Sequence, residues 1–406
     1  MKHIAIIGFG IVGGGLPGVI DSCREGIKNI VGDDINVKYI LDLRDFPDSP
    51  LADRVVHDIT PILEDPEIEV VAETMGGSHP AYEFSIAAME HGISVVTSNK
   101  EVVATFGDKL LECARKNNVQ YLFEASVGGG IPCLRPFATS LAQEKIVSVS
   151  GILNGTTNFI LSKMKFEGRE FADVLAEAQA LGYAERDPSA DVDGIDAMRK
   201  IIILTALATG KLVSADKVYA ETIRNITPAD IDAANRMGGS IKLIGSYKAV
   251  GDKISVYVCP QIVGSSNALS SVNDVYNAIA VNCDITGDVM FYGRGAGRYP
   301  TAGAVLADIT AILSGAAEAE KKHEFTSACD CVMPFGEVPF TYYIRVKDGS
   351  ASDVKETLSR VFDSVSELEG TPVGYAEFIC GKAGHDEIKS ALSVIDGVES
   401  VIRVLE

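Results

Sequence analysis

The chain has 406 residues and carries 36 basic against 56 acidic side chains, a formal net charge of −20 at pH 7. This charge argues against nucleic acid and anionic membrane surfaces as partners. With 47% hydrophobic residues, the chain can bury the cores of two or three domains. The first expected strand begins within three residues of Met1, and no apolar run reaches membrane-spanning length. We therefore expect a cytoplasmic protein without a secretory signal.

The eight cysteines are scattered, and only Cys329 and Cys331 lie close together. Their C-x-C spacing matches no established zinc pattern. We expect reduced cysteines that pack in the core.

A glycine-rich turn follows the first expected strand. Residues 4–7 are apolar and run directly into residues 8–13, GFGIVG, which match the pattern G-x-G-x-x-G. Such glycines permit a tight turn and let the backbone approach a pyrophosphate at the start of the next helix. The position directly after a strand makes this motif specific and predicts a Rossmann-type, doubly wound parallel sheet. Two glycines and a proline in residues 14–17 predict an irregular first helical turn.

The second expected strand, Val37 to Leu43, should end near the ribose of a bound dinucleotide. An acid at this place favours the free 2′-hydroxyl of NAD, and an arginine favours the 2′-phosphate of NADP. The chain offers both, in Asp42 and Arg44, so either cofactor is compatible with the sequence.

The alternation of strands and helices continues to about residue 124. Strands are expected at Val70 to Ala72, Ile93 to Thr97 and residues 119–124, with helices from Pro80 to about His91 and over residues 101–117. Ligands of open α/β sheets bind beyond the carboxyl ends of the strands, which places Glu73 and Lys100 at the crevice. A lysine at a strand end can also be a solvated loop charge, but this position favours a site.

Residues 124–132, EASVGGGIP, contain three consecutive glycines. Glycine exposes its neighbouring carbonyl groups, and we expect this loop to pack little and to act as a flexible hinge between domains.

A second kind of pattern begins near residue 145. A strand at residues 146–153 leads to Asn154-Gly155-Thr156, which opens a helix. This helix start can hold a substrate carboxylate, or it can be an ordinary N-cap. Residues 241–263 alternate around Gly251 and predict a hairpin in a second, mixed sheet, of a kind that commonly pairs across a dimer.

An acidic loop precedes the helix expected over residues 193–209. It contains five acids, namely Glu185, Asp187, Asp191, Asp193 and Asp196. Asp193 is the expected N-cap, while Asp196 and Lys200 are four residues apart and share one helix face. Four apolar residues follow at once, so that face should leave solvent quickly. A lysine held beside a carboxylate there can relay protons or bind an alcohol; the alternative is a surface ion pair worth only tenths of a kcal/mol.

The last seventy residues suggest a third unit. Strands are expected at Thr341 to Val346, Gly374 to Ile379 and Val398 to Val404, with helices at Ala351 to Phe362 and Asp386 to Leu392. The segment Lys347 to Ser350 lacks a proline-glycine turn.

At residues 178–200 the chain resembles the homoserine dehydrogenase family. The matching positions are Ala178, Gly182-Tyr183-Ala184, Asp187-Pro188, Asp191-Val192, Gly194, Asp196 and Lys200. The segments Thr97 to Lys100 and Asn154 to Asn158 and the glycine-rich turn at residues 293–304 resemble further elements of that family. The resemblance implies NAD(P)-dependent, reversible interconversion of L-homoserine and L-aspartate 4-semialdehyde, a step in threonine, methionine and isoleucine biosynthesis. Two alternatives remain: another two-domain NAD(P)-dependent amino-acid oxidoreductase, and a nucleotide-binding amino-acid or redox sensor without catalysis.

The resemblance also implies roles for individual residues. Lys100 and Lys200 would be the catalytic lysines. The substrate would be held by Glu185, Asp191, Asp196, Asn154, Gly155, Thr156 and Gly182. The cofactor would be held by Gly8, Gly10, Ile11, Val12, Gly13, Asp42, Arg44, Thr97, Ser98, Lys100 and Gly297. A monovalent cation, Na⁺ or K⁺, would be bound by Glu124, Val127, Gly129 and Ile131.

The expected architecture has three parts. Residues 1–135 with about 296–320 would form the dinucleotide-binding domain, residues 136–295 an α+β substrate and dimerisation domain, and residues 336–406 an αβ module of the ACT type. That module resembles a threonine-sensing domain of the family, although an oligomerisation module without an effector fits nearly as well. We expect a homodimer or homotetramer that acts on a small molecule.

Overall fold

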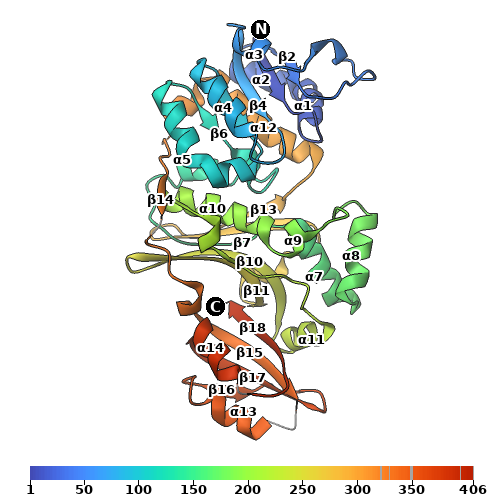
Figure 1. Cartoon of the computed structure of the whole chain (residues 1–406), viewed down its shortest axis with the longest axis vertical. Coiled ribbons are helices and arrows are strands. Elements are labelled where there is room, and N and C mark those ends of the chain that lie inside the picture. Colours follow the sequence, from blue (N-terminus) through green and yellow to red (C-terminus); the bar gives the residue numbers. More distant parts are fainter. Residues whose placement is uncertain (321, 329, 348–350, 394, 406) are drawn as a thin grey trace. The chain divides into compact units, whose positions relative to one another are not determined.

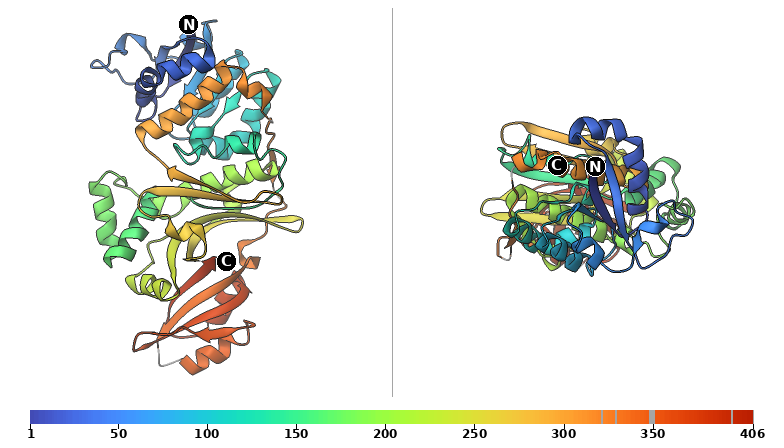
Figure 2. Two further views of the ribbon diagram at one scale, coloured as in Figure 1. Left: turned by 180° about the vertical axis from the view of Figure 1, so that it is seen from behind. Right: turned by 90° about the horizontal axis from the view of Figure 1, so that it is seen from above.

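The computed structural model describes residues 1–406 except residues 321, 329, 348–350, 394 and 406 (Figures 1 and 2). Its chain divides into two compact units. Unit 1 comprises Met1–Ile146, Ile202–Ala215 and Cys283–Ala328, and unit 2 comprises Val147–Ile201, Asp216–Asn282 and Cys329–Glu406.

Unit 1 contains a parallel sheet in the order β3-β2-β1-β4-β5-β6. Its strands are β1 Lys2–Ile7, β2 Ile35–Leu41, β3 Val55–Val56, β4 Ile68–Glu73, β5 Ser94–Thr97 and β6 Tyr121–Leu122. The strand order reverses beside β1, so the carboxyl ends of β1 and β4 border the crevice in which such sheets bind dinucleotides. The expected Rossmann-type parallel sheet is confirmed.

Helices bury the apolar side chains of this sheet. The helices α1 (Leu16–Ser22), α2 (Arg24–Val31) and α12 (Arg298–Leu313) share one hydrophobic core with β1, β2 and β4. The helices α4 (Ala81–Glu90) and α5 (Lys100–Lys116) pack against β4, β5 and β6. A turn of 3-10 helix at Gly13–Gly15 precedes α1, which confirms the irregular helix start. Unit 1 also holds α3 (Thr60–Leu63), α6 (Arg135–Ala138), β13 (Gly287–Arg294) and the paired strands β8 (Lys211–Val213) and β14 (Thr326–Ala328).

The glycine loop after β6 does not pack loosely, and the expectation of a flexible hinge there is wrong. Gly128 and Gly129 are buried and have left-handed φ values of +73° and +54°. A Cβ atom on Gly129 would lie 2.6 Å from the carbonyl oxygen of Gly295, and one on Gly130 would lie 2.7 Å from Pro300 Cβ. These glycines therefore allow two backbone segments of unit 1 to pack closely.

Unit 2 is built on a mixed sheet whose strands follow the order β12-β7-β10-β11-β18-β15-β17-β16. The central strands are β7 Ile146–Ile152, β10 Gly239–Val250, β11 Lys253–Gly264 and β12 Tyr276–Cys283, and β9 (Tyr219–Ala220) pairs with β11. The hairpin expected around Gly251 is confirmed, with β10 and β11 in continuous antiparallel register. The helices of this unit before residue 300 are α7 Gly155–Glu167, α8 Phe171–Ala180, α9 Ser189–Val192 and α11 Pro228–Arg236. Helix α10, Ile195–Thr209, begins in this unit, and its residues from Ile202 onward belong to unit 1.

The C-terminal residues of unit 2 continue this sheet. They form β15 Pro339–Lys347, α13 Ala351–Leu358, β16 Val365–Glu367, β17 Tyr375–Gly384, α14 His385–Leu392 and β18 Val398–Leu405. The last strand pairs antiparallel with β15 and parallel with β11, through Gln261 opposite Arg403 to Val263 opposite Leu405. Strand β16 was not expected, and α13 ends four residues before the expected end at Phe362. The expected loop at Lys347 to Ser350 includes residues 348–350, which lie outside the described residues.

Within the described part of the chain, no helix combines the length and the hydropathy needed to cross a bilayer. The cysteines that the structure describes form no disulfide, and Cys133, Cys259, Cys283 and Cys380 are buried. Cys329, half of the C-x-C pair, lies outside the described residues.

Candidate functional site

The glycine-rich turn joins β1 to α1 at the carboxyl edge of the parallel sheet. Gly8 has a φ of +88°, and Thr74 Oγ1 donates a hydrogen bond of 2.6 Å to its carbonyl oxygen. A Cβ atom on Gly13 would lie 2.1 Å from that same oxygen. A Cβ atom on Gly10 would meet nothing within 4 Å. Packing within the protein therefore requires glycine at positions 8 and 13, while the open space at Gly10 fits the close approach of a pyrophosphate.

Of the residues between these glycines, Phe9 and Val12 pack partly against the hydrophobic core, and Ile11 lies at the surface. The Ile11 side chain is 74% exposed, and the Val12 carbonyl oxygen accepts hydrogen bonds from the next helical turn. Their backbone position, rather than their side chains, makes them candidates for a dinucleotide site.

Asp42 and Arg44 form one hydrogen-bonded pair after β2. Asp42 accepts a hydrogen bond of 2.8 Å from the Phe9 backbone N–H of the glycine turn. Arg44 binds the same carboxylate through Nε at 3.0 Å and Nη2 at 2.9 Å. The guanidinium lowers the pKa of Asp42 to about 2, with further lowering by the backbone N–H groups. Asp42 therefore stays ionised, and its negative charge is balanced by Arg44, whose side chain is 65% exposed.

Lys100 begins helix α5 directly beyond β5. Asn99 caps this helix, because its side-chain oxygen accepts hydrogen bonds from the backbone N–H groups of Glu101 and Val102. The Asn99 N–H donates to Thr97 Oγ1 at 2.9 Å, and Thr97 donates to Glu73 Oε2 at 2.5 Å. The predicted cofactor residues Thr97 and Ser98 and the predicted catalytic Lys100 thus share one turn, which is bonded to the end of β4.

Unit 2 brings four of the predicted residues together around one amide. Asn154 Nδ2 donates to Asp191 Oδ1 at 2.7 Å and to Asp196 Oδ2 at 2.8 Å. Lys200 Nζ donates to the same Asp196 oxygen at 2.8 Å and to the Leu153 carbonyl at 2.7 Å. Asn154, Asp196 and Lys200 are each less than a tenth exposed. This is a buried, hydrogen-bonded cluster, not a surface ion pair.

The start of α7 is held by the same asparagine. Asn154 Oδ1 accepts a hydrogen bond from Thr157 N at 2.8 Å and so caps the helix. Gly155 is required by packing, because a Cβ atom there would lie 2.8 Å from the Val275 carbonyl oxygen. Thr156 Oγ1 donates to the Tyr183 carbonyl at 2.6 Å and thereby ties the helix to the acidic loop. The Asn154 side chain therefore has two roles: its oxygen caps α7, and its Nδ2 bridges the two carboxylates.

The other three acids of the loop lie apart from this cluster, and Asp187 accepts hydrogen bonds from the Ser189 backbone N–H at 3.1 Å and from Ser189 Oγ at 2.6 Å. The expectation that Asp193 caps α10 is wrong, because its carboxylate instead accepts hydrogen bonds from Thr222 Oγ1 and Arg224 Nε, each at 2.8 Å. Glu185 is exposed, and its backbone carbonyl accepts from Gln179 Nε2 at 3.0 Å. Gly182 has a φ of +76° and ends the turn after α8. Among the hydrogen bonds of the described residues, Asp191 and Asp196 accept from Asn154, and Asp196 also accepts from Lys200.

The predicted cation ligands lie on the glycine loop after β6. The Glu124 carboxylate accepts three backbone N–H groups, from Cys133, Leu134 and Arg135, at 2.7, 2.9 and 2.6 Å. Its side chain thus caps α6, which leaves its main-chain carbonyl as the candidate ligand. Val127, Gly129 and Ile131 are buried on the same loop. Among the described residues, no cluster of three acidic, histidine or cysteine side chains could hold a metal ion.

Arg298 was not identified from the sequence. It follows Gly297 at the start of α12, and its Nη2 donates to the Gly14 carbonyl of the glycine turn at 2.8 Å. These positions are separated by 284 residues, so no local pattern could pair them. The contact places a guanidinium beside the expected pyrophosphate site.

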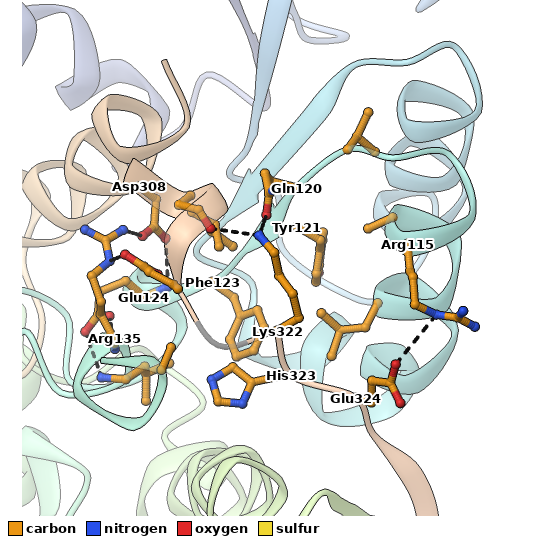
Figure 3. A pocket seen from close by; sticks show the side chains of 18 of the residues that line it. Arg115, Gln120, Tyr121, Phe123, Glu124, Arg135, Asp308, Lys322, His323 and Glu324 are labelled. Atoms are coloured by element: carbon orange, nitrogen blue, oxygen red, sulfur yellow. Dashed lines mark hydrogen bonds and ion pairs between the residues drawn. The ribbon is translucent and has the colours of Figure 1, made fainter. Parts of the chain in front are cut away.

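A cavity of about 370 Å³ lies in unit 1 beside β6 and α5. Figure 3 shows side chains that line it. Arg135 binds Asp308 at 2.6 Å and Glu320 at 3.2 Å, and burial raises the pKa of Asp308 to about 8. Lys322 donates to Gln120 and to the Ala317 carbonyl. These charged groups are already bonded within the protein, and Glu124 is the one predicted site residue that reaches this cavity.

Two family models match the chain, one on each side of residue 130. A model described as "Homoserine dehydrogenase, NAD binding domain" matches residues 8–124, and one described as "Homoserine dehydrogenase" matches residues 132–310. Homoserine dehydrogenase of Neisseria gonorrhoeae is 38% identical over 369 residues, which cover 88% of this chain and 84% of the relative.

Solved structures extend the similarity to the whole chain. A homoserine dehydrogenase from Thiobacillus denitrificans has a TM-score of 0.91 at 31% identity, covering 100% of this chain and 98% of that chain. A hyperthermophilic archaeal homoserine dehydrogenase in complex with NADPH has a TM-score of 0.66 at 29% identity, covering 77% of this chain and 98% of that chain.

Proposed function

Since the chain belongs to the homoserine dehydrogenase family, we propose that the cluster of Asn154, Asp191, Asp196 and Lys200 is the substrate side of its active site. The enzyme is an NAD(P)-dependent oxidoreductase that interconverts L-homoserine and L-aspartate 4-semialdehyde in amino-acid biosynthesis. The observation that carries the proposal is the bridging amide of Asn154, which holds two carboxylates next to one buried lysine.

The substrate presents an ammonium group, a carboxylate and a hydroxyl. Asp191 and Asp196 supply negative charge for the ammonium, and Glu185 on the exposed part of the loop adds to it. Lys200 can donate a hydrogen bond to the substrate oxygen or exchange a proton with it, because its Nζ already bonds a carboxylate that can balance its charge. We assign the same kind of contact to Lys100, and we assign Gly155, Thr156 and Gly182 to shaping the site.

The nicotinamide ring, when bound, accepts or donates the hydride at its C4 atom. The residues of unit 1 fit such a cofactor, because Gly10 leaves room for a pyrophosphate and the turns after β1, β4 and β5 lie at the crevice edge. We assign Gly8, Gly10, Ile11, Val12 and Gly13 to the phosphates, with Gly297 and the adjacent Arg298 beside them. Thr97, Ser98 and Lys100 would lie nearest the reacting end.

We propose that NADP is the preferred form of the cofactor. Arg44 neutralises Asp42 and keeps an exposed guanidinium, which suits a 2′-phosphate better than a free hydroxyl.

The carbonyl groups of Glu124, Val127, Gly129 and Ile131 form our proposed monovalent cation site. Support comes from the two successive left-handed glycines, Gly128 and Gly129, which turn this backbone sharply. Hard cations prefer oxygen ligands of this kind.

The organisation into three domains stays our proposal, with residues 336–406 as a module of the ACT type. Support comes from its order of elements, β15-α13-β16-β17-α14-β18, and from the sheet order β18-β15-β17-β16, which is that of a split βαβ unit. We also propose a homodimer or homotetramer and a cytoplasmic location.

One assay separates the proposed activity from its alternatives. Purified enzyme should reduce NADP with L-homoserine, and Lys200→Ala should lose turnover while binding NADPH normally. A sensor without catalysis would bind the nucleotide without turnover in both proteins. An oxidoreductase with a different substrate would leave L-homoserine unreacted and turn over another amino acid.

A further inference from the structure

Glu73 ends β4 between the glycine turn and the turn that carries Lys100. Its side chain is 0% exposed, and burial raises its pKa to about 7 against the lowering effect of its hydrogen bonds with Thr97 and Met75. A carboxylate in such a place is costly unless both oxygens are hydrogen-bonded. Both are: Oε1 accepts from Met75 N at 2.7 Å, and Oε2 accepts from Thr97 Oγ1 at 2.5 Å.

The Thr97 side of this carboxylate leads directly to Lys100. Thr97 Oγ1 accepts the Asn99 N–H at 2.9 Å, so its single proton is directed at Glu73. Asn99 in turn caps α5 and donates its Nδ2 to the Gly77 carbonyl at 2.7 Å. Lys100 is the first residue of α5, so its backbone position depends on this series of bonds.

The Met75 side leads to the glycine turn. A Cβ atom on Gly8 would lie 2.9 Å from Met75 Cγ and 3.1 Å from Met75 N, so this segment packs directly against the turn. Thr74 adds its own hydrogen bond to the Gly8 carbonyl. The single carboxylate of Glu73 is therefore bonded to both of the turns that border the cofactor crevice.

We propose that Glu73 is a positioning residue that fixes the Thr97–Lys100 turn relative to the glycine turn, so that Lys100 is held at the crevice for hydride transfer. The inference rests on the proposed role of Lys100. The ionised carboxylate suits this role, because the arrangement offers it two donors. If Glu73 were protonated, its O–H and the O–H of Thr97 would be two donors facing each other. Among the neighbouring titratable groups is Tyr121 on β6, whose pKa is raised by burial and further by the charge of Glu73.

The test compares two variants that break the series at different atoms. Glu73→Gln leaves one of the two donors without an acceptor, and Thr97→Val removes the hydroxyl while keeping the carboxylate. We expect each to lower kcat with L-homoserine by about tenfold or more, with KM for L-homoserine changed less than threefold. Glu73→Gln should also leave the Kd for NADPH within threefold. The double variant should be no slower than the slower single variant, because both changes break one series. Wild-type enzyme should also lose kcat on acidification through about pH 7 more steeply than Glu73→Gln.

Ser94→Ala is the matched control. This variant removes a buried hydroxyl from β5, the strand that also carries Thr97. The Ser94 hydroxyl accepts a hydrogen bond from the Gln120 N–H at 3.2 Å, and its loss should leave kcat unchanged. Unchanged kcat in both Glu73→Gln and Thr97→Val, or losses that multiply in the double variant, would overturn the proposal. If Glu73→Gln does not fold, Thr97→Val decides alone.

A Lys100→Ala background separates this proposal from the one it rests on. In that background Glu73→Gln should cause no further loss, since the effect acts through Lys100. An equal fold-loss in both backgrounds would show that Glu73 acts elsewhere. Retained activity of Lys100→Ala itself would instead remove the proposed role of Lys100.

Discussion

Asn154→Asp tests the substrate cluster with a minimal change of shape. The variant keeps the oxygen that caps α7, because aspartate caps helices as well as asparagine does. It removes both Nδ2 hydrogen bonds, to Asp191 at 2.7 Å and to Asp196 at 2.8 Å, and puts a third carboxylate beside them. Hydrogen bonds to charged groups contribute about 1.5–3 kcal/mol each. The substitution therefore removes roughly 3 kcal/mol or more of the free energy that stabilises the arrangement of the cluster. If the transition state for hydride transfer loses the same stabilisation, kcat/KM for L-homoserine falls about 100-fold.

Asn158→Asp is the matched control for this change. It lies one helical turn further along α7 and is equally buried, and its Nδ2 donates to the carbonyls of Val272 at 3.2 Å and Tyr276 at 3.0 Å. We expect it to lower thermal stability but to keep kcat/KM within threefold, because its partners are not in the substrate cluster. Steady-state assays of nicotinamide reduction measure both variants. Equal losses in the two, or more than a third of the activity retained by Asn154→Asp, would refute the role of the bridging amide.

Four further predictions concern other parts of the molecule. Lys200→Ala should reduce turnover by about two to four orders of magnitude while NADPH titration shows normal affinity; more than a tenth of wild-type activity would show that the assignment is wrong. Arg44→Ala should weaken NADPH binding more than NADH binding, by about 1.5–3 kcal/mol; equal effects in fluorescence titrations would mean that Arg44 faces away from the cofactor. Because the pKa of Glu73 is about 7 in the folded state against an ordinary 4.5, stability from this group is full below 4.5 and declines as pH rises through 7, so Tm should fall with pH less in Glu73→Gln than in wild type. Threonine should inhibit weakly or not at all, and strong inhibition of the full chain at low-millimolar threonine would show a working effector site.

Local sequence patterns were enough for much of the fold. The apolar runs that became β1, β4 and β5 are buried on both sides, and each is followed by a turn rich in glycine or polar residues, so their place in a parallel sheet could be predicted. Strand β3 has two residues, too few for a period to appear, whereas the equally short β6 lies within the strand expected at residues 119–124. Strand β13 alternates half-buried with exposed residues and needs a partner strand before it becomes recognisable.

In the candidate site, too, contacts between residues close in the sequence could be predicted, and contacts between distant residues could not. Asp196 and Lys200 lie four residues apart on one helix, so their ion pair followed from helical geometry. The bonds from Asn154 span 37 and 42 residues, and the sequence could supply that residue only through family resemblance. Asp193 had the right spacing for a cap, but Thr222 and Arg224 offered its carboxylate stronger partners. Spacing along the chain shows which bonds are possible, and competition in the folded protein decides which of them form.

The contacts of the C-terminal module change the result expected when the chain is truncated. If the C-terminal module only assembled subunits, a chain ending near residue 330 would keep its activity. In the structure β18 pairs with β11, and the buried Arg403 binds Glu221 at less than the usual ion-pair distance, 2.6 Å. Tyr257 and Cys259 of β11 belong to the hydrophobic core of the module. The archaeal relative covers 77% of this chain and 98% of its own length, so at least one relative is a shorter chain. Here, however, truncation would uncover an apolar strand and leave Glu221 without its ion-pair partner, with only the Tyr219 hydroxyl still bonded to its carboxylate among the described residues. We therefore expect the shortened chain to lose thermal stability and to aggregate before any change in turnover can be assigned to regulation.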